Sequence, residues 1–567
     1  MNIRNDNDLV HKLSLDDIDT HFPGTSYRPL QKESIVAICN AFNTGKRIVI
    51  AELPTGSGKS MIATTLCKMH DNAYYITATK ILQDQIEKDF DGGDFVTLKG
   101  KSNYKCDLYE RNDNAFKHVT MTMPEEELLE LKCDAGLCSL SNTMGGCAHC
   151  FDGSSSKLYK GHLPVLPPDR TYSACEYYDR VEKADNAKIA SMNFDNFILH
   201  LNYNNKAFGK RSLLVIDEGH AIEDKVLDFL GSTITSSLIE SQVPKLDSAS
   251  DYVNWFVKEH FFEHLQEKYN DMIKKKNIKQ ALKLSESLKK LAICFADIRR
   301  RPEYWVAEHS SKGSFSKAEL KPVIVGDNVH NLLFDHVDRV LILSATILDQ
   351  KHYRQSMEIT DDESAFIMAP STFNPKRMPI YLDYAGTFTG GVAKMNEWIG
   401  HMANKIVQIC KEHDGQKGML HTHSFGIQQA LLTKLPKHII SRIITQEMYP
   451  DKKELLQCHA DSRDTIIMAP AMHEGVDLKD DLCRFNVVCK VPYANYFDDK
   501  RLSKRMEIDK DYYSNITIKK IVQSIGRGMR SSDDYVNNYI IDGHFDVLYK
   551  RSKSKFPKWF NDAVVKT

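Results

Sequence analysis

A short glycine-rich segment carries the residues best suited to bind phosphate. Residues 54–60 read Pro-Thr-Gly-Ser-Gly-Lys-Ser, with an apolar run before them and a helical pattern after them. Gly56 and Gly58 allow backbone amides to approach an anion closely, and Lys59 can reach the β- and γ-phosphates of ATP. The Ser60 hydroxyl is suited to bind Mg²⁺, and the following helix adds its positive dipole end. The candidate nucleotide-binding residues are Thr55, Gly56, Ser57, Gly58, Lys59 and Ser60.

Two acidic residues follow another apolar run far downstream. Asp217 and Glu218 come directly after Leu213–Ile216, so a buried strand would place them at the sheet edge where ligands gather in open α/β folds. Asp217 is suited to hold Mg²⁺, and Glu218 to orient or deprotonate the attacking water. Acidic residues also cap helices, so the pair alone is a weak signal. Combined with the phosphate loop, it predicts ATP hydrolysis.

A third group lies near the end of the chain. Arg527 and Arg530 follow Gln523 and, three residues apart, would share a helix face. Arginines that reach across a cleft between domains can stabilise the γ-phosphate during hydrolysis. A surface arginine pair is the alternative, and these residues alone do not decide between the two.

Six of the thirteen cysteines are concentrated in residues 106–175. In a chain without an apolar export signal, such a cluster indicates a metal or iron–sulfur site more than disulfides. The stretch is rich in Gly, Ser and Pro and can bury little apolar surface. If its cysteines bound nothing, no interaction would offset the conformational entropy lost when the stretch becomes ordered. Zinc and an iron–sulfur cluster both fit the spacing. The six residues are Cys106, Cys133, Cys138, Cys147, Cys150 and Cys175.

The elements that must position these residues alternate between strand and helix. This alternation predicts an α/β fold with parallel sheets covered by helices. Two successive sets indicate two sheet domains, as expected for 567 residues, which are too many for one core. The expected strands are 47–52, 74–77, 96–99, 188–193, 213–216, 339–343, 418–423, 465–469, 487–491 and 535–542, with helices at 61–70 and 81–90.

Residues 245–301 contain no Gly or Pro and interrupt this alternation. Apolar residues recur there at spacings of three and four, which predicts long helices, and they include Ala281, Leu284, Leu288, Leu291, Phe295 and Ile298. The lysines of this segment suit either a phosphate backbone or a solvated helix face, and both interpretations stay open. They are Lys274, Lys275, Lys276, Lys279, Lys283, Lys289 and Lys290.

The overall composition is that of an ordinary globular protein. The 75 Lys+Arg residues balance 76 Asp+Glu residues, so the net charge does not indicate a nucleic-acid partner, although a local basic groove would suffice to bind one. The N-terminus is polar, and no run of 18 apolar residues could span a membrane. We therefore expect a cytoplasmic protein. A nucleoid-associated or a nuclear location is the alternative, depending on the source.

Taken together, the motifs resemble superfamily 2 helicases, specifically the XPD/DinG branch of iron–sulfur DNA helicases, over nearly the whole chain. Arg28 and Gln31 are similar to the adenine-recognition element, and Asp-Glu-Gly-His at 217–220 is characteristic of this branch. Leu53 replaces the first glycine of the general P-loop, as is common in this superfamily. Glu474, Gly475 and Asp477 resemble motif V, and 523–530 resembles motif VI. Segments 76–85, 344–346, 421–424 and 490–493 are similar to motifs Ia, III, IV and the strand after motif V.

The resemblance implies specific roles. The catalytic set would be Lys59, Asp217, Glu218, Gln523, Arg527 and Arg530, with the two arginines as arginine fingers. A [4Fe–4S] cluster would be held by Cys106, Cys138, Cys150 and Cys175, with Cys147 as the alternate and Cys133 as the least suitable. Residues 99–106 and 175–178 resemble the segments that carry the first and last ligands, although Glu176 replaces the usual Pro.

The resemblance also implies an architecture and an activity. Two RecA-like motor domains would be divided as 1–105, an Fe–S insert at 106–175, 176–221, a helical arch-like insert at 222–325, 326–352 and a second motor domain at 353–567. With ATP and Mg²⁺, the protein would move 5′-to-3′ on single-stranded DNA and unwind forked DNA. The alternatives are an ATP-driven DNA translocase that does not unwind, or an RNA-directed helicase with a zinc site.

Overall fold

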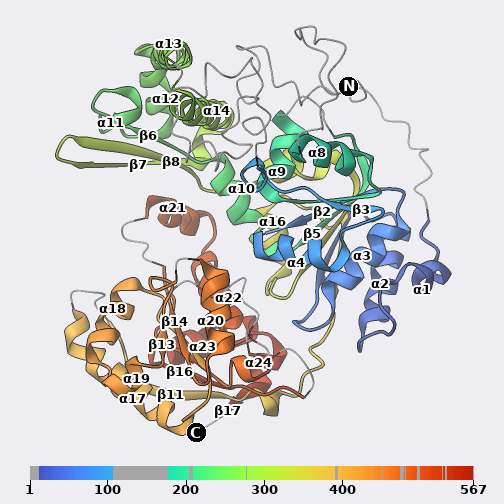
Figure 1. Cartoon of the computed structure of the whole chain (residues 1–567), viewed down its shortest axis with the longest axis vertical. Helices are drawn as coiled ribbons and strands as arrows, with labels where there is room; N and C mark the ends of the chain where they lie inside the picture. Colours follow the sequence, from blue (N-terminus) through green and yellow to red (C-terminus); the bar gives the residue numbers. More distant parts are fainter. Residues whose placement is uncertain are drawn as a thin grey trace.

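The computed structural model describes residues 12–78, 80–105, 176–203, 208–275, 277–389, 394–449, 451–470, Met472, Leu478, 480–494, 499–526, 528–529 and 533–565. Within these residues the chain forms two seven-stranded parallel sheets and one three-stranded antiparallel sheet. The two large sheets lie in separate halves of the molecule, joined by the chain after β10 (Figure 1). The predicted α/β fold with two parallel-sheet domains is confirmed.

The first sheet has the strand order β10-β1-β9-β5-β2-β4-β3, and all of its pairs are parallel. Its strands are β1 (Ile48–Glu52), β2 (Ala73–Thr77), β3 (Phe95–Thr97), β4 (Ile189–Asn193), β5 (Arg211–Asp217), β9 (Val337–Ser344) and β10 (Ser364–Met368). Its main helices are α2 (Gln31–Asn43), α3 (Lys59–Met69), α4 (Lys80–Phe90), α8 (Glu176–Asn186), α9 (Phe194–Ile198), α10 (Ile222–Leu230) and α16 (Gln350–Ser356).

Both faces of this sheet are covered, which explains the continuous apolar runs in the sequence. In β1, Ile48 and Ile50 enter one core cluster, whereas Val49 and Ala51 enter the other. Successive side chains of a strand point to opposite faces, so a strand between two helical layers must be apolar at every position. Because β1 and β5 both pair in parallel with β9, their carboxyl ends lie at the same edge of the sheet, where the phosphate loop and the acidic pair begin.

The first sheet extends further along the chain than the sequence indicated. β10 lies beyond residue 352, where we expected the first domain to end, and its Ser364–Met368 pair in parallel with β1. This edge strand carries no motif, and its partner is more than 300 residues away in the chain. Only long-range pairing assigns it to the first sheet.

The segment expected to be a helical insert is built from both helices and strands. The apolar spacing at 281–298 is confirmed by α14 (Ile278–Arg300), which packs against α13 (Phe261–Lys274) and α12 (Ala249–Lys258). A sheet of β6 (Ser232–Thr235), β8 (Phe315–Pro322) and β7 (Trp305–Lys312) supports these helices. The description of 222–325 as helical is corrected accordingly, because the strands flank the helical run on both sides and were read as part of it.

The second sheet has the order β13-β14-β12-β15-β16-β11-β17. Its strands are β11 (Ile380–Gly386), β12 (Gly418–His421), β13 (Ile443–Ile444), β14 (Ile466–Ala469), β15 (Phe485–Val488), β16 (Asn537–Asp542) and β17 (Val564–Val565). Its helices include α17 (Met395–Glu412), α18 (Phe425–Lys434), α20 (Lys452–Asp461), α21 (Lys500–Ile508), α22 (Tyr512–Ile525), α23 (His544–Ser552) and α24 (Lys558–Ala563). Among the helices that the structure describes, none has the length and apolar character to cross a membrane.

Candidate nucleotide site and its contact with the second domain

The phosphate loop connects β1 directly to α3. Gly56 and Gly58 have φ angles of 82° and 76°, in the left-handed region that favours glycine. A Cβ atom on Gly58 would lie 2.2 Å from Nε2 of Gln31, so a side chain there would displace the Gln31 amide from the loop. Leu53, which replaces the usual glycine, is fully buried in the core, and its N–H donates to the Ser344 carbonyl at 2.9 Å. The loop is thus anchored to β9 at its first residue.

The two residues expected to recognise adenine lie against this loop. Nη1 of Arg28 donates to the Gly56 carbonyl at 2.7 Å, and Nε2 of Gln31 donates to the Gly58 carbonyl at 3.1 Å. The Arg28 N–H donates in turn to Oε1 of Gln31 at 2.9 Å. These bonds hold the start of α2 beside the phosphate loop.

Tyr75 brings the two candidate Mg²⁺ ligands together. Its hydroxyl donates to Oδ2 of Asp217 at 3.1 Å, and the Ser60 side chain is close enough to influence the pKa of Tyr75. Burial raises the pKa of Asp217 to about 6, with the Glu218 charge adding to the shift and the Lys59 ammonium opposing it. A divalent cation would favour the ionised carboxylate. The residues present therefore fit Mg²⁺, and the buried Ser57 hydroxyl, which lacks a hydrogen-bond partner within the described residues, fits a phosphate oxygen.

The acidic pair ends in a tightly packed turn. Glu218 has a left-handed φ of 58°, and its N–H donates to Oδ1 of Asp217 at 3.0 Å. The next residue must be glycine, because a Cβ on Gly219 would lie 2.2 Å from Cγ2 of Ile342. The Gly219 carbonyl accepts a hydrogen bond from the Tyr353 hydroxyl at 2.6 Å. The packing explains the glycine at the third position of Asp-Glu-Gly-His.

His220 connects the nucleotide site to the second domain. Its Nδ1 lies 3.0 Å from Oγ of Ser344 and 3.2 Å from Oε2 of Glu218. On the other side of the ring, Nε2 of His220 lies 2.9 Å from the Gln523 side-chain amide on α22, within hydrogen-bond distance. Nζ of Lys519, also on α22, donates to the His220 carbonyl at 2.7 Å. One imidazole thus contacts the candidate catalytic residue Glu218, β9 and the second sheet domain.

Several expected site residues lie outside the described residues. They are Arg527, Arg530, Glu474, Gly475 and Asp477, together with Cys106, Cys133, Cys138, Cys147, Cys150 and Cys175. Within the described part of the chain, no three His, Cys, Asp or Glu side chains gather as a metal site. No motif marks Tyr75 or Lys519, since their contacts are with partners on other strands and helices.

Comparisons with known proteins cover both sheet domains. Residues 25–245 match the family described as "Type III restriction enzyme, res subunit", and residues 406–563 match the "Helicase C-terminal domain" family. The "ATP-dependent DNA helicase CHL1" of Saccharomyces cerevisiae is 28% identical over 140 residues, which are 20% of this chain and 16% of that protein. The protein of the same name from Candida albicans is 26% identical over 115 residues, 17% of this chain and 13% of that protein. The match thus spans less than a fifth of these relatives.

Solved structures share the fold over most of the chain. The structure titled "XPD_Helicase" has a TM-score of 0.60 at 14% identity and covers 96% of this chain and 100% of that one. "Structure of S. tokodaii Xpd4" has a TM-score of 0.52 at 14% identity, with 95% and 99% covered. The fold places a phosphate-binding loop in the first of two RecA-like parallel-sheet domains. In sequence and fold the chain is thus similar to helicases of the XPD/CHL1 type.

Proposed function

We propose that the chain is an ATP-dependent DNA helicase that moves 5′-to-3′ on a single strand and unwinds forked DNA. The hydrogen bond between His220 and Gln523 carries this proposal, because it joins the candidate catalytic acid of one domain to the second domain. A residue that contacts both can report the state of the nucleotide to the distant sheet. The DNA substrate is suggested by the names of the CHL1 relatives, and the 5′-to-3′ direction by the family resemblance.

The residues divide the work of hydrolysis between them. Lys59 and the amides of the loop hold the phosphates, while Arg28 and Gln31 fix the loop beside the base. Mg²⁺, held by Ser60 and Asp217, would supply charge neutralisation at the β- and γ-phosphates. Glu218 orients the attacking water, and its contact with His220 links that step to Gln523. We place Arg527 and Arg530 at the γ-phosphate and Glu474, Gly475 and Asp477 at the same cleft.

Stimulation of the ATPase activity tests whether the nucleic-acid substrate is DNA or RNA. The ATPase rate should rise with single-stranded DNA oligonucleotides and much less with RNA of the same sequence. Lys59→Ala should lower the rate by about a hundredfold or more, because an electrostatic contact to the transferring phosphoryl group is lost. Lys68→Ala, in the last turn of the same helix, is the matched control and should leave it unchanged. Stronger stimulation by RNA would select the RNA-directed alternative.

We further propose that 106–175 carries a [4Fe–4S] cluster on Cys106, Cys138, Cys150 and Cys175. The described residues at the two ends of this insert meet, since the rings of Tyr104 and Tyr177 lie 5.5 Å apart. Nζ of Lys101 lies over the same Tyr177 ring, at 5.3 Å from its centroid. Ends that start side by side allow the first and last ligands to share one cluster, which takes four thiolates.

The metal content of protein purified without oxygen tests this assignment. We expect iron and sulfide in equal amounts, lost on Cys106→Ser or Cys175→Ser and kept on Cys458→Ser, a cysteine on α20 far along the chain. If iron and sulfide are lost in Cys147→Ser but kept in Cys150→Ser, the third ligand is Cys147 and not Cys150. Zinc without iron would contradict the cluster and support the zinc alternative.

A further inference from the structure

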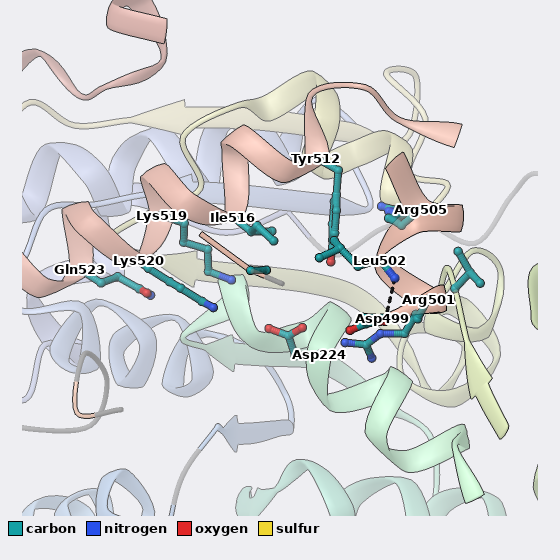
Figure 2. Close-up of a pocket in the computed structure, with 12 residues that line it drawn as sticks. Asp224, Asp499, Arg501, Leu502, Arg505, Tyr512, Ile516, Lys519, Lys520 and Gln523 are labelled. Atoms are coloured by element: carbon teal, nitrogen blue, oxygen red, sulfur yellow. Dashed lines mark hydrogen bonds between the residues drawn. The ribbon is translucent and has the colours of Figure 1, made fainter. Parts of the chain in front are cut away.

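A basic cavity lies between the motor domains, beside the His220 contact. It measures about 330 Å³, near the lower end of the range for small-ligand pockets. One wall comes from the first domain and its insert through Asp224 and Val323, and the other comes from α21 and α22. Figure 2 shows Lys519 and Lys520 reaching from α22 toward the helix that bears Asp224.

The charges that line the cavity are mainly positive. Four cationic side chains face two carboxylates: Arg501, Arg505, Lys519 and Lys520 against Asp224 and Asp499. The Asp499 carboxylate caps α21, because its Oδ1 accepts a hydrogen bond from the Leu502 N–H at 2.9 Å. Asp224 is exposed to solvent, which screens its charge. The cavity therefore keeps a small excess of positive charge, even when Glu223, which pairs with Arg505, is counted with the lining residues.

The cations differ in how far they are already paired. Arg505 is buried, 2.9 Å from Glu223, yet its Nε has no hydrogen-bond partner within the described residues. Lys519 donates to the His220 carbonyl. In the described part of the chain, the Arg501 guanidinium makes neither a hydrogen bond nor an ion pair, although it lines the cavity. A planar guanidinium with free donors is the side chain best suited to bind a phosphate group.

We infer that this cavity binds a phosphate group, held chiefly by Arg501 and Lys520. Two sources share this chemistry: a backbone phosphate of the bound strand and a free phosphate ion. The strand source rests on the proposed function, whereas the free ion does not. Because the walls come from both domains, either ligand would bind best in the closed arrangement, and Lys519 would connect its binding to His220.

Two binding measurements on the full chain separate these sources. Fluorescence anisotropy with a labelled oligo(dT) reports the strand, and calorimetry with inorganic phosphate reports the free ion. In the second measurement a non-hydrolysable ATP analogue fills the phosphate loop. The variants are Arg501→Glu, Arg501→Lys and the control Lys510→Glu, an exposed lysine between α21 and α22 that does not line the cavity. Equal melting temperatures would show that the variants fold.

A strand phosphate predicts that Arg501→Glu weakens oligo(dT) binding by about tenfold and lowers the salt slope by about one, with recovery in Arg501→Lys. A free phosphate predicts that Arg501→Glu abolishes phosphate binding and leaves oligo(dT) affinity unchanged. The inference is overturned if Arg501→Glu behaves like Lys510→Glu in both measurements. Failure of the wild type to bind any oligonucleotide would instead count against the proposed function, and the phosphate measurement would still decide the cavity.

Discussion

At the scale of single residues, His220 is the point where the nucleotide site meets the second domain. Its ring contacts Glu218 and Ser344 on one side and Gln523 on the other. Residues that share one hydrogen bond act as a unit, so their substitutions do not add. The three contacts together offer a route by which a change at Glu218 could reach α22.

We therefore expect His220→Ala and Gln523→Ala to lower DNA-stimulated ATPase activity by similar factors. The double variant should be scarcely worse than either single variant, with a coupling energy of about 0.5–3 kcal/mol. Nucleotide binding, measured by titration, should be kept, because neither side chain belongs to the phosphate loop. Effects that multiply fully in the double variant would show that the contact does not couple the domains.

Gly219 lies in the tightly packed turn after the acidic pair. An added Cβ would lie 2.2 Å from Ile342, so Gly219→Ala must displace the acidic pair or β9. We expect a loss of about 1–3 kcal/mol in stability and of most ATPase activity. Gly400→Ala in α17 is the control, since nothing lies within 4 Å of its Cβ position. An active, stable Gly219→Ala variant would contradict the packing described for this turn.

At the scale of elements, a buried histidine fixes α20 to the second sheet domain. His459 is fully buried, with Nδ1 2.9 Å from Oγ1 of Thr465 and Nε2 2.8 Å from the Leu482 carbonyl. Burial lowers the pKa of His459 to about 4 from an ordinary value of 6.5. The folded state therefore holds the neutral ring, whereas the unfolded chain takes up a proton below pH 6.5.

Its contribution to stability is thus present above pH 6.5 and is lost as the pH falls toward 4. Between these values we expect the stability advantage of the wild type over His459→Gln to shrink by up to about 3 kcal/mol. Denaturant unfolding of both proteins at several pH values measures this difference. A difference that stays constant with pH would mean that His459 titrates normally.

The elements also show what the sequence could and could not predict. The strand before the phosphate loop and the helix after it follow from local apolar patterns, and β1 and α3 lie within two residues of the predicted bounds. β10 and the three-stranded sheet were missed, because short edge strands have weak patterns and their pairing partners are distant in sequence. Tyr75 was missed for a similar reason: its role depends on β2 lying beside β5.

At the scale of the whole molecule, α21 joins the insert of the first domain to the second domain. The Lys500 N–H donates to Oε1 of Glu308 at 2.9 Å, and its Nζ donates to the Ala307 carbonyl at 3.2 Å. Arg505 of the same helix pairs with Glu223 on α10. In Figure 1, α21 lies between the insert and the second sheet. Closure of the cleft would therefore pull on the insert as well as on the nucleotide site.

We propose that ATP hydrolysis at this site drives strand separation. It is tested by unwinding of 5′-tailed and 3′-tailed DNA duplexes, with wild type, Lys59→Ala and the Lys68→Ala control. We predict ATP-dependent separation of the 5′-tailed duplex by wild type and Lys68→Ala, none by Lys59→Ala, and little on the 3′-tailed duplex. Separation only from the 3′ tail would contradict the direction. ATP hydrolysis stimulated by DNA without separation of either duplex would contradict the helicase assignment and leave a translocase.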